Sequence, residues 1–320
     1  MKPRVLVVHK ILPEALDYLD RHADVEIGTD AELLPKSDLI RRLADKDGLL
    51  PLLVDIIDRD VIDSAPHLKI IANCAVGYNN IDVPYTRSRG ILVTNTPGVL
   101  TEATAELTWA LILAAARRIP QADRFIRDGS FKGWAIDLFL GKGLAGKRLG
   151  LIGMGRIGRA VALRASAFEM DVVYTDPHPL SADEETASGA SHRNLEDLLQ
   201  SSDVVSLHVS LNPETRRLLS REKIGLMKRG AILINTSRGE TVDEAALVDA
   251  LKTGHLGAAG LDVYEREPEI NPGLFALDNV VLLPHIGSAT YETRLNMSLT
   301  AARNLVQGLR GERPDNLVEP

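Results

Sequence analysis

The glycines between residues 150 and 158 form the first group whose types and spacing indicate chemistry. The segment reads Gly150-Leu151-Ile152-Gly153-Met154-Gly155-Arg156-Ile157-Gly158 and contains the pattern G-x-G-x-x-G between an apolar run and an amphipathic stretch. Gly153 permits a tight turn, Gly155 lets the backbone approach a pyrophosphate, and Gly158 lets the helix pack closely on its strand. The amides and the dipole at the helix start then face the anion, and Arg156 and Ile157 are expected to contact the cofactor. The motif predicts a dinucleotide-binding site.

An acidic residue follows the next predicted strand at the spacing that such a site requires. Asp176 comes directly after Val172–Thr175 and lies 18 residues beyond Gly158. A carboxylate at this place binds the ribose hydroxyls of NAD and repels the 2′-phosphate of NADP. The sequence therefore predicts NAD as the cofactor.

Three further polar segments follow predicted strands, at the sheet edge where ligands of α/β proteins collect. They are Asn235-Thr236-Ser237-Arg238-Gly239, Asp262-Val263-Tyr264-Glu265-Arg266-Glu267-Pro268 and Pro284-His285-Ile286-Gly287-Ser288-Ala289-Thr290. Taken one at a time, Arg238 is equally compatible with a surface ion pair, Glu267 with a solvated charge run and His285 with a core histidine. The segments alone do not specify a reaction.

The elements that position these residues alternate between short β-branched runs and amphipathic stretches, which is typical of parallel α/β folds. In the first third, helical patterns include Pro13–His22 and Asp38–Asp45. Predicted strands there are Val5–Val8, Val25–Ile27, Leu49–Val54, Lys69–Ala72 and Ile91–Thr94. These elements predict one small doubly wound domain.

A long helix from Thr101 is expected to bridge to a second, larger domain, in which the glycine motif opens the helix Arg159–Phe168. Its predicted strands are Arg148–Ile152, Val172–Thr175, Val204–His208, Ala231–Asn235, Gly260–Val263 and Val280–Leu283. The last helical pattern, Tyr291 to Leu309, has no strand of its own to cover in that sheet and can pack back on the first domain. We expect residues 1–100 with 287–320 to form the substrate-binding domain, and residues 101–286 to form the dinucleotide-binding Rossmann domain.

Composition narrows the class of protein further. The 320 residues carry a formal net charge of −7, which argues against a general affinity for nucleic acid or anionic membrane. The single cysteine, Cys74, and the lack of zinc-type spacing fit a cytoplasmic protein with no structural metal. Small molecules are the expected partners.

Together these motifs resemble the D-isomer-specific 2-hydroxyacid dehydrogenases over essentially the whole chain. Within that family, three strings look most like glyoxylate and hydroxypyruvate reductases. They are Val76-Gly77-Tyr78-Asn79-Asn80-Ile81-Asp82, Thr94-Asn95-Thr96-Pro97-Gly98-Val99-Leu100-Thr101-Glu102-Ala103-Thr104-Ala105-Glu106 and His285-Ile286-Gly287-Ser288-Ala289-Thr290. The resemblance implies two doubly wound, Rossmann-like domains with the active site in the cleft between them.

The resemblance also assigns roles. Arg238 is the substrate anchor, because its guanidinium can hold a keto acid through two directed hydrogen bonds. His285 is the proton donor, and Glu267 favours the charged form of its imidazole and fixes its orientation. Other family positions map to Leu53, Val76 and Gly77 at the substrate, with the backbone amides from Val76 to Tyr78 receiving its carboxylate, and to Thr236, Asp262 and Gly287 at the cofactor, with Asp262 reaching the nicotinamide amide.

The function implied is NADH-dependent reduction of glyoxylate or hydroxypyruvate to glycolate or D-glycerate, by a homodimer built on the helix and loop from Thr101. Two alternatives remain open. One is another D-2-hydroxyacid dehydrogenase, such as a D-3-phosphoglycerate dehydrogenase. The other is a dinucleotide-sensing binding protein similar to the transcriptional corepressors that share this fold.

The remaining notable residues receive simpler interpretations. His208 is expected to be structural and Cys74 a buried small hydrophobe. Trp134 resembles a tryptophan near the substrate mouth that a partner subunit presents. The other histidines are expected at surface or loop positions, namely His9, His22, His67, His178, His192 and His255.

Overall fold

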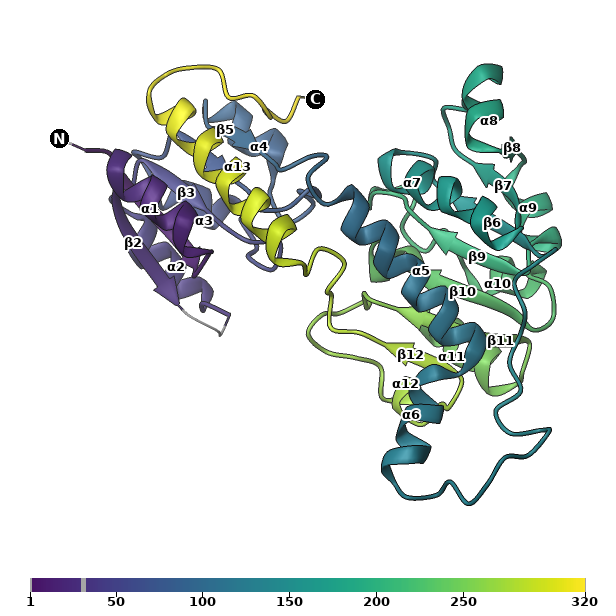
Figure 1. The fold of residues 1–320 in the computed structure, drawn as a ribbon. Helices are drawn as coiled ribbons and strands as arrows, with labels where there is room; N and C mark the ends of the chain where they lie inside the picture. Colours follow the sequence, from purple (N-terminus) through teal and green to yellow (C-terminus); the bar gives the residue numbers. More distant parts are fainter. Residues whose placement is uncertain (1, 30–32, 320) are drawn as a thin grey trace. The chain divides into compact units, whose positions relative to one another are not determined.

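The computed structural model describes residues 2–29 and 33–319. The chain divides into two compact units, which are described separately. Unit 1 comprises Met1–Leu100 with Ser288–Pro320, and unit 2 comprises Thr101–Gly287. Each unit contains a wholly parallel β-sheet with helices around it (Figure 1).

Unit 1 is built on a sheet with the strand order β2-β1-β3-β4-β5. Its strands are β1 Arg4–His9, β2 Asp24–Thr29, β3 Gly48–Leu50, β4 Ile70–Ala72 and β5 Leu92–Thr94. Its helices are α1 Pro13–His22, α2 Lys36–Leu43, α3 Arg59–Asp63, α4 Val83–Ser88 and α13 Tyr291–Leu309. The central strands are almost continuously apolar because helices cover both faces of the sheet.

Alternate residues of β1 show how the two faces are covered. Val5 and Val7 pack in a core with α1 and α13, whereas Leu6 and Val8 pack in a second core with α2, α3 and α4. Figure 1 shows α13, in yellow, beside α1 in this unit. The last helix of the chain thus returns to unit 1, where its apolar face has a sheet to cover.

Small residues let α13 approach that sheet closely. A methyl group built on Gly308 would lie 2.4 Å from Cδ1 of Ile70 on β4, and one built on Gly48 would lie 3.0 Å from Cδ1 of Leu305. Both distances are shorter than ordinary van der Waals contact. The packing therefore requires glycine, which has no side chain, at both positions.

Unit 2 has a larger sheet with the strand order β12-β11-β10-β9-β6-β7-β8. Its strands are β6 Arg148–Ile152, β7 Asp171–Thr175, β8 Ala190–His192, β9 Val204–Leu207, β10 Ala231–Asn235, β11 Leu256–Leu261 and β12 Val280–Leu282. Its α-helices are α5 Thr101–Arg117, α6 Ile119–Arg127, α7 Arg156–Ala165, α8 Ala182–Ser188, α9 Leu195–Ser201, α10 Arg221–Leu226, α11 Glu244–Lys252 and α12 Pro272–Phe275, with short 3₁₀ turns η1 Ser166–Phe168 and η2 Gly239–Thr241.

Three elements of unit 2 differ from the sequence-based expectation. β8 was not predicted, because its three residues, two of them polar and exposed, do not form an apolar run. β11 begins at Leu256 rather than Gly260. Its first half consists mainly of glycine and alanine, which let the strand pack close to α5: a methyl group on Gly260 would lie 3.0 Å from Cβ of Leu111. α7 begins at Arg156 rather than Arg159, directly after the glycine turn.

The helix that opens unit 2 ends at Arg117, after the predicted start at Thr101. Arg118 adopts a left-handed conformation with φ of 55° and separates α5 from α6. α5 is largely buried, whereas α6 has no buried residue. In residues 2–29 and 33–319, no helix is both long and apolar enough to cross a membrane.

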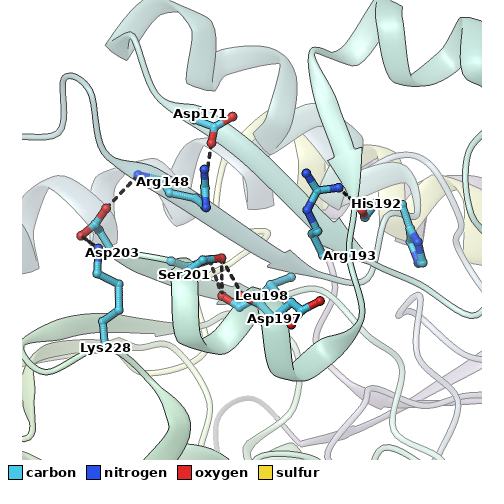
Figure 2. Close-up of polar contacts among 10 residues, drawn as sticks. Arg148, Asp171, His192, Arg193, Asp197, Leu198, Ser201, Asp203 and Lys228 are labelled. Carbon is cyan, nitrogen blue, oxygen red and sulfur yellow. Dashed lines mark hydrogen bonds and ion pairs between the residues drawn. The ribbon is translucent and has the colours of Figure 1, made fainter.

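The amino ends of the strands in unit 2 carry paired charges (Figure 2). Arg148 opens β6, and its Nε lies 2.6 Å from Asp171, the first residue of β7. Its backbone N–H donates to Asp203, just before β9, and Lys228 donates to the same carboxylate at 2.5 Å. Since all strands are parallel, this edge is opposite the one at which their carboxyl ends meet.

The close approach of α13 gives a stability prediction. We expect Gly308→Val to lower the free energy of unfolding by about 1–3 kcal/mol, because the added atoms overpack against Ile70. Urea unfolding followed by circular dichroism measures the effect. Gly225→Val is the control, since Gly225 on α10 is exposed with no atom within 4 Å of an added Cβ, and a change within about 0.5 kcal/mol is expected. Equal stabilities of the two variants would contradict the packing argument.

Candidate active site

The predicted site residues of unit 2 follow β6, β7, β10, β11 and β12 at the carboxyl edge of its sheet. Because parallel strands end at the same edge, loops that are distant in sequence meet there. Several side chains in these loops bond to backbone groups, and these bonds determine where the reactive groups lie.

The glycine loop after β6 has the geometry that the motif requires. Gly153 has φ of 97°, and a methyl group there would lie 2.6 Å from the carbonyl oxygen of His208. A methyl group on Gly158 would lie 2.2 Å from the carbonyl oxygen of Gly153, so helix and turn are in close contact. Gly155, by contrast, has no atom within 4 Å of an added Cβ. Open space beside the first turn of α7 fits a dinucleotide phosphate held by the amides of Arg156 and Ile157.

Asp176 joins this loop to the end of β7. Its Oδ2 accepts a hydrogen bond from the backbone N–H of Met154 at 2.7 Å, and its Oδ1 accepts one from the N–H of His178 at 2.9 Å. A carboxylate has further acceptor positions, so these bonds leave it able to receive ribose hydroxyls. Asp176 therefore orders the glycine loop after β6 and also places a negative charge beside it.

The loop after β10 is fixed around Arg238 by its own side chains. Asn235 Nδ2 and Thr241 Oγ1 both donate to the carbonyl oxygen of Arg238, at 2.9 and 2.6 Å. At Gly239 the loop passes so close to the next one that an added Cβ would lie 1.9 Å from the carbonyl carbon of Tyr264. Only glycine permits this contact, which brings the Arg238 loop against the segment that carries Glu267.

Arg238 is half-buried, and burial lowers the pKa of its guanidinium from the ordinary value, while the nearby charges of Glu267 and Glu240 act in the opposite direction. An arginine remains charged in either case. The site thus holds a fixed positive charge close to the carboxylate of Glu267.

Glu267 and His285 form a close pair. Nδ1 of His285 lies 2.7 Å from Oε2 of Glu267, and Oε1 of Glu267 accepts the backbone N–H of Tyr264 at 2.9 Å. Burial opposes ionisation of Glu267, but the hydrogen bond and charge of His285, the Tyr264 amide and Arg238 outweigh it, and the pKa of Glu267 lies below its ordinary value. Since an ionised carboxylate only accepts, Nδ1 carries a proton.

The opposite ring nitrogen, Nε2 of His285, makes no hydrogen bond with any residue in the described part of the chain. The side chain keeps 24% of its surface exposed. A histidine oriented by a carboxylate on one nitrogen, with no protein hydrogen bond on the other, has the arrangement of a general acid or base.

Asp262 holds the loop on which His285 lies. Its two carboxylate oxygens accept the backbone N–H groups of Ile286 at 2.7 Å and Gly287 at 2.8 Å, and its carbonyl accepts the N–H of His285. His285 itself is left-handed, with φ of 53°. Burial raises the pKa of Asp262, although the two amides partly oppose this rise.

The other predicted cofactor positions lie in the same unit. Thr236 Oγ1 is 3.1 Å from Thr108 Oγ1 on α5, and the carbonyl of Gly287 accepts Thr104 Oγ1 at 3.2 Å. His208 is hydrogen bonded to Ser206, and burial lowers its pKa to about 3, which makes it a neutral structural residue. Nowhere in the described part of the chain do three or more His, Cys, Asp or Glu side chains gather as a metal site.

The predicted substrate residues Leu53, Val76 and Gly77 belong to unit 1, where they are half-buried in the loops that follow β3 and β4. The expectation of a surface or loop position for His9 is wrong. His9 ends β1, is 8% exposed, and its Nε2 lies 2.8 Å from Oδ1 of Asp55 in the Leu53 loop. The hydrogen bond to Asp55 offsets the cost of burying the ring, and a single sequence does not reveal that partner.

Comparison with known proteins decides the family. The profile of the D-isomer-specific 2-hydroxyacid dehydrogenase NAD-binding domain matches residues 109–287. The chain is 47% identical to the glyoxylate reductase of Thermococcus litoralis over 99% of its length and 97% of that protein. The chain belongs to the D-isomer-specific 2-hydroxyacid dehydrogenase family. It is therefore an oxidoreductase with a domain for a nicotinamide dinucleotide.

Two further relatives from this family are informative. The chain is 50% identical to the glyoxylate reductase of Aeropyrum pernix, over 99% of this chain and 96% of the relative. The crystal structure of an NADPH-dependent glyoxylate/hydroxypyruvate reductase from Sinorhizobium meliloti, solved with NADP and malonate, superimposes with a TM-score of 0.88 at 33% identity, covering 99% and 97% of the two chains.

Sequence reasoning did not identify the residues that hold the loops of this dehydrogenase. From their residue types alone, Asn235 and Asp262 were polar residues at strand ends. The resemblance assigned Asp262 to the nicotinamide amide, and nothing showed that either side chain bonds to backbone. Thr104 and Thr108 lay in a helical pattern without a chemical signal. A position at the carboxyl end of a parallel strand is the one feature that could have indicated Asn235 and Asp262.

The Glu267–His285 pair gives a prediction about pH. Glu267→Gln keeps a side chain that can hydrogen bond but removes the charge that favours protonated imidazole. Because keto-acid reduction requires a proton donor, the alkaline limb of the reduction profile should move to lower pH by roughly 1 unit. Steady-state rates between pH 5 and 10 measure this shift.

Glu265→Gln is the matched control, because Glu265 lies in the same segment but pairs with Arg217 at 2.9 Å. Its profile should coincide with that of the wild type. An unmoved alkaline limb in Glu267→Gln would contradict the role of the pair.

Proposed function

We propose that this dehydrogenase reduces glyoxylate or hydroxypyruvate with NADH, forming glycolate or D-glycerate. The observation that carries the proposal is the Glu267–His285 contact of 2.7 Å beside the charge of Arg238. Relatives of 47% and 50% identity that are named glyoxylate reductases support the choice of substrate.

The side chains of unit 2 suit the reduction of a keto group. The reduced nicotinamide supplies hydride to the keto carbon when it is bound, and negative charge grows on the keto oxygen. His285 donates the proton from Nε2 to that oxygen, and Glu267 stabilises the charged ring before the transfer and orients it. Arg238 orients the substrate through its guanidinium, whose charge also stabilises the developing oxyanion.

The carboxylate of the substrate is assigned to the backbone amides between Val76 and Tyr78 in unit 1, with Leu53 lining a small pocket. The loops 74–80 and 50–53 contain no Lys or Arg. A substrate phosphate would be a dianion without a basic partner there, which is costly. We therefore favour unphosphorylated keto acids over 3-phosphohydroxypyruvate.

NAD(H) is the proposed cofactor because Asp176 provides negative charge at the end of β7. Its carboxylate accepts hydrogen bonds from the backbone of Met154 and His178, so its position beside the glycine loop is fixed. The relative from Sinorhizobium meliloti is NADPH-dependent, so membership of the family does not by itself decide between the two cofactors. The carboxylate disfavours the additional 2′-phosphate.

We also propose that the chain forms a homodimer through α6 and the loop that follows it. Apolar side chains gather there in solvent, among them Ile126, Trp134 and Ile136, with Trp134 79% and Ile136 77% exposed. The Phe125 and Phe139 rings lie 5.2 Å apart and attach the loop to α6. A second copy would cover this surface with the same surface, as in two-fold dimers, and Trp134 would then be presented to the partner.

The substrate proposal predicts an order of activities. Glyoxylate and hydroxypyruvate should be reduced with much higher kcat/KM than 3-phosphohydroxypyruvate at matched NADH. Highest kcat/KM of the wild type on the phosphorylated acid would favour a phosphoglycerate dehydrogenase. NADH binding by the wild type without turnover of any keto acid would favour a sensor.

The assignment of His285 as the proton donor gives a separate prediction. His285→Ala should lower kcat by roughly two to four orders of magnitude while NADH binding persists, since only the proton donor is lost.

The cofactor proposal predicts that Asp176→Asn raises the ratio of kcat/KM with NADPH to that with NADH by roughly 10-fold, because the amide retains an acceptor but not the charge. Asp171→Asn, at the amino end of the same strand, should leave the ratio unchanged. A wild type that already prefers NADPH would contradict the placement of Asp176 at the ribose.

The dimer proposal predicts that the double variant Trp134→Ser with Ile136→Ser has half the mass of the wild type in size-exclusion chromatography with light scattering. Phe275→Ser is the control, because this residue is exposed on α12 and lies outside the proposed surface. A monomeric wild type, or a dimeric double variant, would disprove the interface.

A further inference from the structure

Two asparagines lie at equivalent positions on neighbouring strands of unit 1. Asn73 directly follows β4 and Asn95 directly follows β5. The two strands are paired with Ala72 opposite Thr94, and the backbone N–H of Asn73 donates to the carbonyl of Thr94 at 2.9 Å. The two side chains therefore start from the same edge of the sheet.

Both side-chain amides donate to one short loop. Nδ2 of Asn95 donates to the carbonyl oxygen of Val76 at 2.8 Å, and Nδ2 of Asn73 donates to the carbonyl oxygen of Gly77 at 2.8 Å. The bonds thus fix two consecutive peptide groups, 76–77 and 77–78.

The planarity of the peptide bond converts this arrangement into a binding geometry. In a trans peptide the N–H of one residue points away from the carbonyl of the residue before it. With the carbonyls of Val76 and Gly77 held by asparagines, the N–H groups of Gly77 and Tyr78 point in the opposite directions. Among the residues that the structure describes, neither N–H donates to an acceptor. Successive free amides of this kind form a receptor for an anion.

We propose that Asn73 and Asn95 are positioning residues that hold the 76–78 loop ready for the carboxylate of the keto acid. The inference rests on the proposed function, since it requires that this loop receives the substrate. Neither side chain touches the substrate in this proposal. They act by fixing the amides that do, so that the ordering of the loop does not have to occur on binding.

A second layer of hydrogen bonds supports the pair from inside unit 1. Asn73, which is fully buried, and Asn80 exchange side-chain amide bonds at 3.3 and 3.4 Å. Nδ2 of Asn80 also donates to the carbonyls of Leu52 and Asp55, at 3.1 and 3.0 Å. Oδ2 of Asp55 accepts the N–H of Leu52, and its Oδ1 contacts His9. The loop that carries Leu53 and the 76–78 loop are therefore parts of one network.

The test replaces each donor by a side chain of similar shape that has no charge and no hydrogen-bonding group. Asn95→Leu and Asn73→Leu are suitable, because aspartate would itself repel the substrate. Asn279→Leu is the matched control, since Nδ2 of Asn279 likewise donates to backbone carbonyls, those of Leu251 and Gly257, but in unit 2. Asn95 is only half-buried, so its variant serves if Asn73→Leu does not fold.

We expect KM for glyoxylate to rise about 10-fold in Asn95→Leu and Asn73→Leu, the factor that corresponds to the loss of one hydrogen bond that holds the amides. The inhibition constant of oxalate, which has carboxylates but no reducible carbonyl, should rise by a similar factor. The Kd for NADH, measured by nicotinamide fluorescence, should stay within 2-fold. Asn279→Leu should change neither KM nor the oxalate constant.

A merely structural role would lower the melting temperature and leave these constants unchanged. Folded Asn95→Leu with KM and oxalate inhibition within 2-fold of the wild type, while the wild type reduces glyoxylate, would overturn the assignment and leave the proposed function intact. A wild type that reduces no keto acid would overturn the proposed function, and this inference with it.

Discussion

The position of His285 depends on a carboxylate that is not expected to exchange protons with substrate. Asp262 accepts the amides of Ile286 and Gly287 with its two oxygens and the amide of His285 with its carbonyl. Three successive backbone groups after β12 are thereby attached to the end of β11. This attachment places the imidazole within 2.7 Å of Glu267, which lies five residues beyond Asp262 on the loop after β11. The acid–base pair is thus a product of two adjacent strand ends.

The same device recurs at other strand ends. Asp176 orders the glycine loop after β6, Asn235 orders the loop that carries Arg238, and Asn73 and Asn95 order the loop after β4 in unit 1. In each case a short polar side chain bonds to backbone rather than projecting into solvent. Loops without regular structure gain a defined conformation in this way, because their peptide groups have partners that the strands hold in place.

The sequence predicted the features that follow from local pattern. The apolar runs indicated two parallel sheets, the limits of α1 and α13 agree with their periodicity, and the turn at Gly153 has the positive φ that its motif requires. Features that depend on distant partners were not predictable. The contact of Gly239 with Tyr264 and the burial of His9 beside Asp55 join segments far apart in the chain, and no spacing rule connects them.

The two edges of the sheet in unit 2 differ in how well they tolerate chemical modification, because the site loops lie at only one of them. The charged pairs of Arg148, Asp171, Asp203 and Lys228 lie at the amino edge of the sheet in unit 2 (Figure 2). A five-residue strand spans roughly 16 Å, so this edge is about that far from the carboxyl edge. An exposed ion pair such as Arg148–Asp171 contributes little to stability, which makes it replaceable. A fluorophore, an affinity handle or an electrode linker attached there would leave the glycine loop and the imidazole undisturbed.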